Sequence, residues 1–126
     1  MAKKKVAISI GDLNGIGIEI ALKAHKEIAE MVEPYYIIGR VMLDQASSKL
    51  SVKVPKGFNT ISAEEEAFKI EPGKVSKKSG VYSFASFKKA ISLAKNGEVD
   101  AICTLPIHKE AWSKACLLYT SPSPRD

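Results

Sequence analysis

The sequence predicts an α/β fold in which helices cover both faces of a parallel sheet. A short apolar run rich in β-branched residues, Val6–Ile10, stops at Gly11 and is followed by a glycine-rich turn and an amphipathic helix. A complete strand–helix–strand unit fits within about the first forty residues, and Val99–Thr104 repeats the pattern of a buried strand followed by a polar loop. Such units join parallel strands through right-handed crossovers.

Each further element follows from apolar spacing and from turn residues. The expected strands are Lys5–Ile10, Tyr35–Ile38, Val52–Val54, Asn59–Ile61 and Val99–Thr104. The expected helices are Gly15–Met31, Arg40–Leu50, a third that Ser76 or Ser79 caps and Asn96-Gly97 ends, and another from Glu110. Pro34 is expected to stop the first helix, Glu64–Glu66 to form a solvated loop, and Pro72-Gly73 to form a turn.

Helical spacing also predicts which faces are buried. The expected buried stripe of the first helix is Ile16, Ile20, Ala24, Ile28 and Met31. The expected apolar face of the third helix is Val81, Phe84, Ala85, Phe87, Lys88, Ala90, Ile91 and Ala94. His25, in mid-helix, is interpreted as a surface or packing residue rather than a ligand.

Composition limits the possible classes of protein. The chain has 126 residues, of which 45% are hydrophobic and 26% charged, as in an ordinary soluble domain. No apolar run is long enough to span a bilayer and no signal peptide is evident, which predicts a cytoplasmic location. The net charge is +5, but the lysines are mostly dispersed, so nucleic-acid binding is not expected. Cys103 and Cys116 form neither a disulfide framework nor a metal motif.

Two polar loops are candidates for ligand binding. Gly11, Asp12, Asn14 and Gly15 follow the first strand, and Thr104, His108 and Lys109 follow the last one. Ligands of open α/β sheets bind at the carboxyl ends of the strands, and these groups suit a small anionic, hydroxylated molecule. The first loop is neither a dinucleotide fingerprint nor a P-loop. A plain tight connection that binds nothing is the alternative for each loop.

Several motifs resemble one enzyme family. Gly11-Asp12-x-x-Gly15-Ile16-Gly17-x-Glu19 is similar to the N-terminal signature of 4-hydroxythreonine-4-phosphate dehydrogenases. Lys78-Ser79-Gly80 and the segment Val99–Ala111 resemble later motifs of that family, in the same order. A related signature occurs in isocitrate and isopropylmalate dehydrogenases, so the resemblance implies their fold. Leu13-Asn14 and Ile18 depart from the family pattern, which usually has proline-alanine and proline there.

The resemblance implies an activity for the whole enzyme. Family members oxidise and decarboxylate 4-phosphooxy-L-threonine with NAD and a divalent metal, in pyridoxal phosphate (vitamin B6) biosynthesis, and act as homodimers. Carried over to this sequence, Gly11, Asp12, Asn14 and Gly15 are expected on the cofactor side, and Thr104, His108 and Lys109 on the substrate side. The family's metal ligands lie beyond the position of Ala115, so no catalytic or metal-binding residue is assigned within this chain.

The end of the sequence departs from the family. Cys116–Asp126 resembles no motif of the family and looks like a translated sequencing adapter, so residues 116–126 are expected to be a non-native tail. Residues 1–115 are then an incomplete N-terminal lobe, expected to be inactive and poorly soluble alone. The alternatives are a dehydrogenase of a phosphorylated four-carbon sugar acid, such as threonate or erythronate phosphate, and a non-catalytic ligand-binding α/β module.

Overall fold

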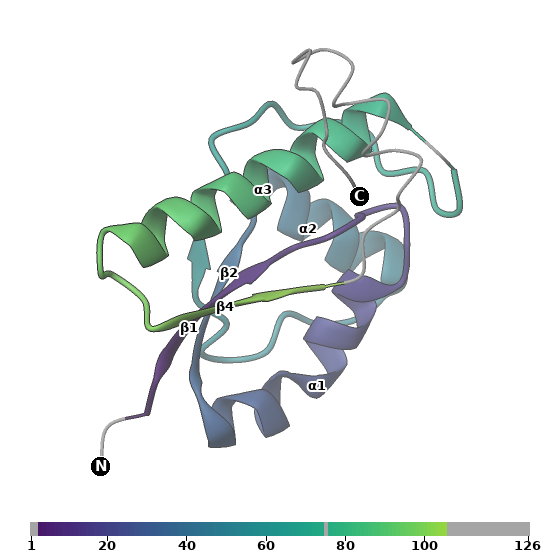
Figure 1. Ribbon diagram of the computed structural model, residues 1–126. Helices are drawn as coiled ribbons and strands as arrows, with labels where there is room; N and C mark the ends of the chain where they lie inside the picture. Colours follow the sequence, from purple (N-terminus) through teal and green to yellow (C-terminus); the bar gives the residue numbers. More distant parts are fainter. Residues whose placement is uncertain (1–2, 75, 106–126) are drawn as a thin grey trace.

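The chain forms a four-stranded parallel sheet with helices on both faces. The structure is a computed structural model that describes residues 3–74 and 76–105. The elements are β1 (Lys5–Ser9), α1 (Gly17–Met31), β2 (Glu33–Ile37), α2 (Arg40–Leu50), β3 (Thr60–Ile61), α3 (Lys77–Lys95) and β4 (Ala101–Thr104). The strand order is β3-β2-β1-β4, and every pair is parallel (Figure 1). The predicted α/β fold is confirmed.

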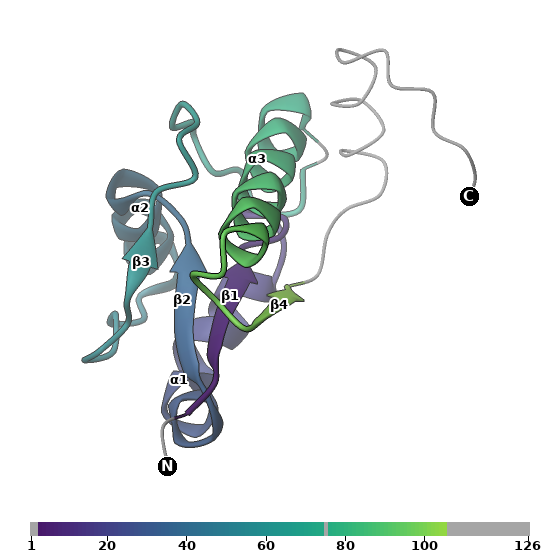
Figure 2. The same ribbon diagram turned by 60° about the vertical axis from the view of Figure 1, so that its left-hand side comes forward.

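The three helices take the faces that right-handed crossovers require. The chain moves in one direction across the sheet from β1 through β2 to β3, and in the opposite direction from β3 to β4. Right-handed connections therefore place α3 on the face opposite α1 and α2. Figures 1 and 2 show α3 on one side of the strands and α1 on the other. The core lies in the two layers between the helices and the sheet.

The predicted buried stripe of α1 is largely wrong, since only Ala24 and Ile28 of its members are half-buried, and Ile28 packs against the core. Ile16, Ile20 and Met31 are 66%, 46% and 72% exposed, whereas the buried positions are Gly17, Ile18, Ala21, Leu22 and His25. Apolar residues occur around most of this helix, so helical spacing alone does not identify the face that meets the sheet. The contact with Tyr36 of β2 identifies that face. The Tyr36 hydroxyl lies 2.9 Å from His25 Nδ1, so His25 is a packing residue.

The predicted face of α3 is also largely wrong. Ala90 is buried as expected, but Lys88 and Ile91 are exposed, and Val81, Phe84, Ala85, Phe87 and Ala94 are only half-buried. The face against the sheet consists instead of Ser79, Gly80, Tyr82, Ser83, Ser86, Ala90 and Leu93. Small serines let this helix approach the strands closely, and the Ser86 hydroxyl bonds to Ile10 N and Ile37 O, backbone groups that an apolar side chain would leave unpaired.

Smaller corrections concern the ends of elements. Val52–Val54 is not a strand, and α1 begins at Gly17 because residues 12–15 form a turn. Pro34 lies inside β2 rather than before it. Glu33 N donates to Lys4 O on the β1 side and Tyr36 N donates to Asn59 O on the β3 side. Backbone N–H groups along a strand point alternately to its two neighbours, so the nitrogen of Pro34 points to the β3 side. Pairing with β3 starts only at Tyr36, so the missing N–H of Pro34 removes no hydrogen bond from the sheet. The expected helix from Glu110 lies outside the described residues.

Candidate functional site

The two candidate loops begin at the same edge of the sheet. β1 and β4 are parallel neighbours with Ser9 opposite Thr104, and Leu105 N donates to Ser9 O at 2.9 Å. Both strands therefore end together, and the exposed Thr104 lies beside the start of the loop at Gly11. The structure confirms that these two segments start at one rim, and it describes the second one only as far as Leu105. His108 and Lys109 lie outside the described residues.

The first loop is a tight turn built on its glycines. Gly11 has a φ of +70°, a conformation that favours glycine. Gly15 N donates to Asp12 O at 3.0 Å, and a Cβ on Gly15 would lie 3.4 Å from that oxygen. Asn14 N donates to Asp12 Oδ1 at 3.1 Å. The turn thus needs glycine at Gly11, whereas a Cβ at Gly15 would make only an ordinary contact.

Asp12 joins this loop to the start of α3. Its side chain is nearly buried, at 7% exposure, and Oδ1 accepts a 2.8 Å hydrogen bond from the Ser79 hydroxyl. Ser79 lies in the first turn of α3, where Ser76 caps the helix by accepting from Ser79 N at 3.3 Å. A carboxylate in this position is stabilised by the helix dipole. Asp12 therefore fixes the loop against a helix that is distant in sequence.

Asn14 joins the loop to the turn at residues 71–74. It is 3% exposed. Its Oδ1 accepts from Glu71 N at 2.9 Å, and its Nδ2 donates to Lys74 O at 3.0 Å. The sequence reveals this polar residue but not the segment that it contacts, which lies about sixty positions away. That Asp12 and Asn14 bind a cofactor stays a prediction, and in this structure both side chains are engaged by the protein.

The N-terminus of α1 gives the rim its capacity for anions. No side chain caps this helix at Ile16, so backbone N–H groups of its first turn lack a side-chain acceptor. Free N–H groups at a helix start bind phosphate and carboxylate groups. The turn and this helix start are therefore a candidate place for an anionic group. Glu19, in the same turn, is paired with Lys23 at 2.7 Å.

A metal does not fit the described part of the rim. Among residues 3–74 and 76–105, no cluster of three or more His, Cys, Asp or Glu residues is suited to hold a metal ion.

In the same part of the chain, no helix has the length and apolar character needed to cross a membrane.

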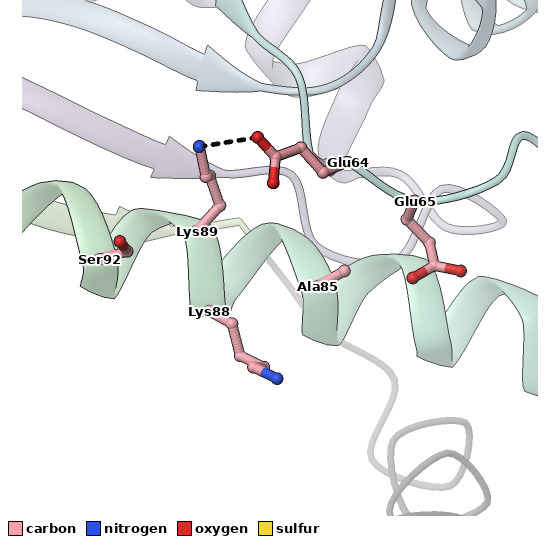
Figure 3. A pocket seen from close by; sticks show the side chains of 7 residues that line it. Glu64, Glu65, Ala85, Lys88, Lys89 and Ser92 are labelled. Carbon is pink, nitrogen blue, oxygen red and sulfur yellow. Dashed lines mark hydrogen bonds and ion pairs between the residues drawn. The ribbon is translucent and has the colours of Figure 1, made fainter.

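The hollow in Figure 3 lies between α3 and the segment after β3. It has a volume of about 300 Å³ and is lined by Ala63, Glu64, Glu65, Ala85, Lys88, Lys89 and Ser92. Lys89 pairs with Glu64 at 3.1 Å, and the Glu64 side chain is 71% exposed. This hollow is open to solvent and contains no nucleophile–base pair, so we do not regard it as an active site.

Comparison with known proteins identifies the family. The family model described as pyridoxal phosphate biosynthetic protein PdxA matches residues 19–122. The chain belongs to this family. It is 50% identical over 119 residues to the 4-hydroxythreonine-4-phosphate dehydrogenase of Sulfurimonas denitrificans, an alignment that covers 94% of this chain and 38% of the relative. The chain thus spans less than two fifths of the length of that curated PdxA-family relative.

Solved structures support the fold. A 4-hydroxythreonine-4-phosphate dehydrogenase from Burkholderia phymatum matches with a TM-score of 0.79 at 23% identity, over 100% of this chain and 42% of that one. A putative enzyme of the same name from Salmonella typhimurium matches with a TM-score of 0.75 at 29% identity, over 95% and 42%. These neighbours confirm a dehydrogenase-like fold of which the chain covers about two fifths. The resemblance noted in the sequence motifs is therefore confirmed for the PdxA family.

Proposed function

We propose that this chain supplies the N-terminal lobe of an NAD-dependent dehydrogenase that oxidises and decarboxylates 4-phosphooxy-L-threonine in pyridoxal phosphate biosynthesis. The observation that carries the proposal is the parallel pairing of β1 with β4, which brings the Gly11–Gly17 loop and Thr104 to one rim. The rest of the cleft, including any metal ligands, is proposed to come from the part of the relatives' length that this chain does not span. The whole enzyme is proposed to be a homodimer.

The residues of the rim have distinct proposed roles. NAD, when bound, would accept a hydride from the carbon that bears the secondary hydroxyl of the substrate, while the hydroxyl would release a proton. Gly11 and Gly15 let the backbone approach the cofactor, while Asp12 and Asn14 keep the loop in shape. Thr104, at the end of β4, offers a hydroxyl to the substrate. His108 and Lys109, the next polar residues, are proposed to meet its phosphate or carboxylate charge.

A composite enzyme tests the proposal. Residues 1–115 are joined to the part of the Sulfurimonas denitrificans relative that follows the aligned position, and NADH formation is followed at 340 nm. We expect activity with 4-phosphooxy-L-threonine from the composite enzyme and none from the 126-residue chain. The composite is expected to behave as a dimer in light scattering coupled to size-exclusion chromatography.

The same assay separates the alternatives. Threonate phosphate and erythronate phosphate serve as competing substrates, and faster turnover of either would assign the chain to a sugar-acid enzyme instead. A folded composite that neither binds NAD nor turns over any of the three substrates would favour the non-catalytic binding module. NADH formation by the isolated chain would contradict our account of an incomplete cleft.

A further inference from the structure

The segment between β3 and α3 crosses the molecule without regular secondary structure. We call residues 62–74 the strap. Figure 1 shows the chain after β3 running along α3 toward the start of that helix. The backbone of such a segment has no ladder of its own, so its N–H and C=O groups need other partners. At its beginning, Glu64 of the strap pairs with Lys89 of α3 (Figure 3).

Gln45 of α2 clamps the middle of the strap. Its Nε2 donates to Phe68 O at 2.8 Å, and its Oε1 accepts from Ile70 N. Phe68 and Ile70 are 8% and 3% exposed, so their side chains are part of the core. One amide side chain thus bonds to a carbonyl and an N–H two residues apart, much as a neighbouring strand would.

Asn14 clamps the end of the strap in the same way, at the rim. Its side chain bonds to Glu71 N and Lys74 O, and its own carbonyl accepts from Gly73 N at 2.7 Å. Lys74 N donates to Glu71 O at 3.0 Å, which closes a turn in which Gly73 has a φ of +79°. Three hydrogen bonds from one residue therefore hold this turn against the Gly11–Gly17 loop.

These contacts restrict what Asn14 can do. Both ends of its amide are engaged, and only 3% of the residue is exposed. Burial leaves little room for a cofactor to reach the second N–H or the second lone pair of this amide. Gln45 makes the same type of contact with the strap away from the Gly11–Gly17 loop.

We propose that Asn14 is a positioning residue for the cofactor side of the site: it fastens the Glu71–Lys74 turn to the Gly11–Gly17 loop and acts through that turn rather than by touching NAD. The strap and the loop then form one rigid wall at the rim. The inference rests on the proposed function for the identity of the cofactor. The clamp itself rests on the contacts of Asn14 alone.

The first experiment measures the clamp without using activity. In the composite enzyme, hydrogen exchange is followed by mass spectrometry in Asn14→Ala and in the matched control Gln45→Ala. Asn14→Ala is expected to speed exchange about tenfold in the peptide covering 71–74 and to leave 68–70 unchanged, since two ordinary hydrogen bonds are lost. Gln45→Ala is expected to give the reverse pattern. Unchanged exchange at 71–74 in Asn14→Ala overturns the clamp.

The second experiment separates positioning from direct contact. Gly73→Ala strains the turn through its positive φ but leaves Asn14 intact, and no atom lies within 4 Å of the added Cβ. If Asn14 acts through the turn, Asn14→Ala and Gly73→Ala both raise the NAD dissociation constant, by about three- to tenfold, as the loss of a preorganised wall predicts. The KM for 4-phosphooxy-L-threonine stays unchanged.

If the NAD dissociation constant rises in Asn14→Ala but not in Gly73→Ala, the positioning role is overturned and Asn14 contacts NAD directly. NAD affinity is measured by equilibrium titration, so a composite that is inactive but binds NAD still gives a result. Failure of the unsubstituted composite to bind NAD refutes the proposed function and, with it, the positioning role. The hydrogen-exchange test of the clamp does not depend on whether the composite binds NAD.

Discussion

Removing the Ser86 hydroxyl should destabilise the ends of β1 and β2, from which the Gly11–Gly17 loop extends. Its hydroxyl accepts from Ile10 N at 2.9 Å and donates to Ile37 O at 2.8 Å, and Ser86, Ile10 and Ile37 are all 0% exposed. The hydroxyl thus bridges β1 and β2 just before the Gly11 loop begins. Ser86→Ala leaves one N–H and one C=O buried without a partner, and each such group costs about 1–3 kcal/mol.

We expect Ser86→Ala to lower the free energy of opening at Ile10 by about 2–6 kcal/mol, the sum for the two groups. This corresponds to exchange that is faster by a factor of about 30 to about 25,000, at 1.36 kcal/mol per factor of ten. Hydrogen exchange mass spectrometry of the peptide spanning β1, in the composite enzyme, measures the effect. The loss is a large share of the total stability of a typical domain, so the urea midpoint should fall as well.

Ser92→Ala is the matched control, because it makes the same substitution on an exposed position of α3. Both variants gain the same small helix propensity, about 0.5 kcal/mol, so the difference between them isolates the bridge. The control should leave exchange in β1 unchanged. If Ser86→Ala and Ser92→Ala differ by less than about 0.5 kcal/mol, the Ser86 bridge contributes nothing net and our reasoning about the helix–sheet interface is wrong.

Three further predictions concern Tyr36, Tyr82 and Thr104. Burial raises the pKa of Tyr36 to about 12, so the unfolded chain ionises first as the pH rises above 10. Tyr36 should therefore lower stability by about 2–3 kcal/mol between pH 10 and 12 in urea titrations. Tyr36→Phe should remove this share and leave that of Tyr82, whose pKa is also raised by burial. The Tyr82 hydroxyl accepts from Gly39 N at 2.7 Å, so Tyr82→Phe should destabilise the start of α2 by about 1–2 kcal/mol, seen as faster exchange at Gly39. Thr104→Val, at an exposed position, should lower kcat/KM of the composite about fivefold without changing its melting temperature, and an unchanged kcat/KM would remove Thr104 from the site.

Several helices and turns are predicted well because the residues that specify each of them lie close together in the sequence. α2 matches its predicted span, Arg40–Leu50, and the Pro72-Gly73 signal marks a turn in which Gly73 has a positive φ. Ser76 caps α3 as expected. The repeated strand-and-loop pattern predicts that the loops after β1 and β4 start at the same edge of the sheet, and the parallel pairing of these strands agrees with this. In each case the residues that specify the feature are neighbours in sequence or obey a general rule of connection.

The buried faces of α1 and α3 could not be predicted in this way. A face is chosen by the element that it meets, and that element is distant in sequence. His25 is buried because Tyr36 and Phe58 surround it, with ring centroids 5.6 Å and 5.3 Å away. Ser86 is buried because two strand ends need its hydroxyl. Both residues are less hydrophobic than the exposed isoleucines of these helices. A rule based on apolar spacing therefore assigns the wrong face of each helix to the core.

The same reasoning explains why polar loop residues are ambiguous as site candidates. A long irregular strap needs side-chain partners for its backbone, and short amides placed on neighbouring elements satisfy that need. Asn14 and Gln45 both do so here, although only Asn14 follows a strand in the pattern typical of a ligand loop. In sequence, a residue that clamps a strap and a residue that binds a cofactor look identical. They differ only in what lies opposite them, which is why Asn14→Ala must be compared with a variant of the strap itself.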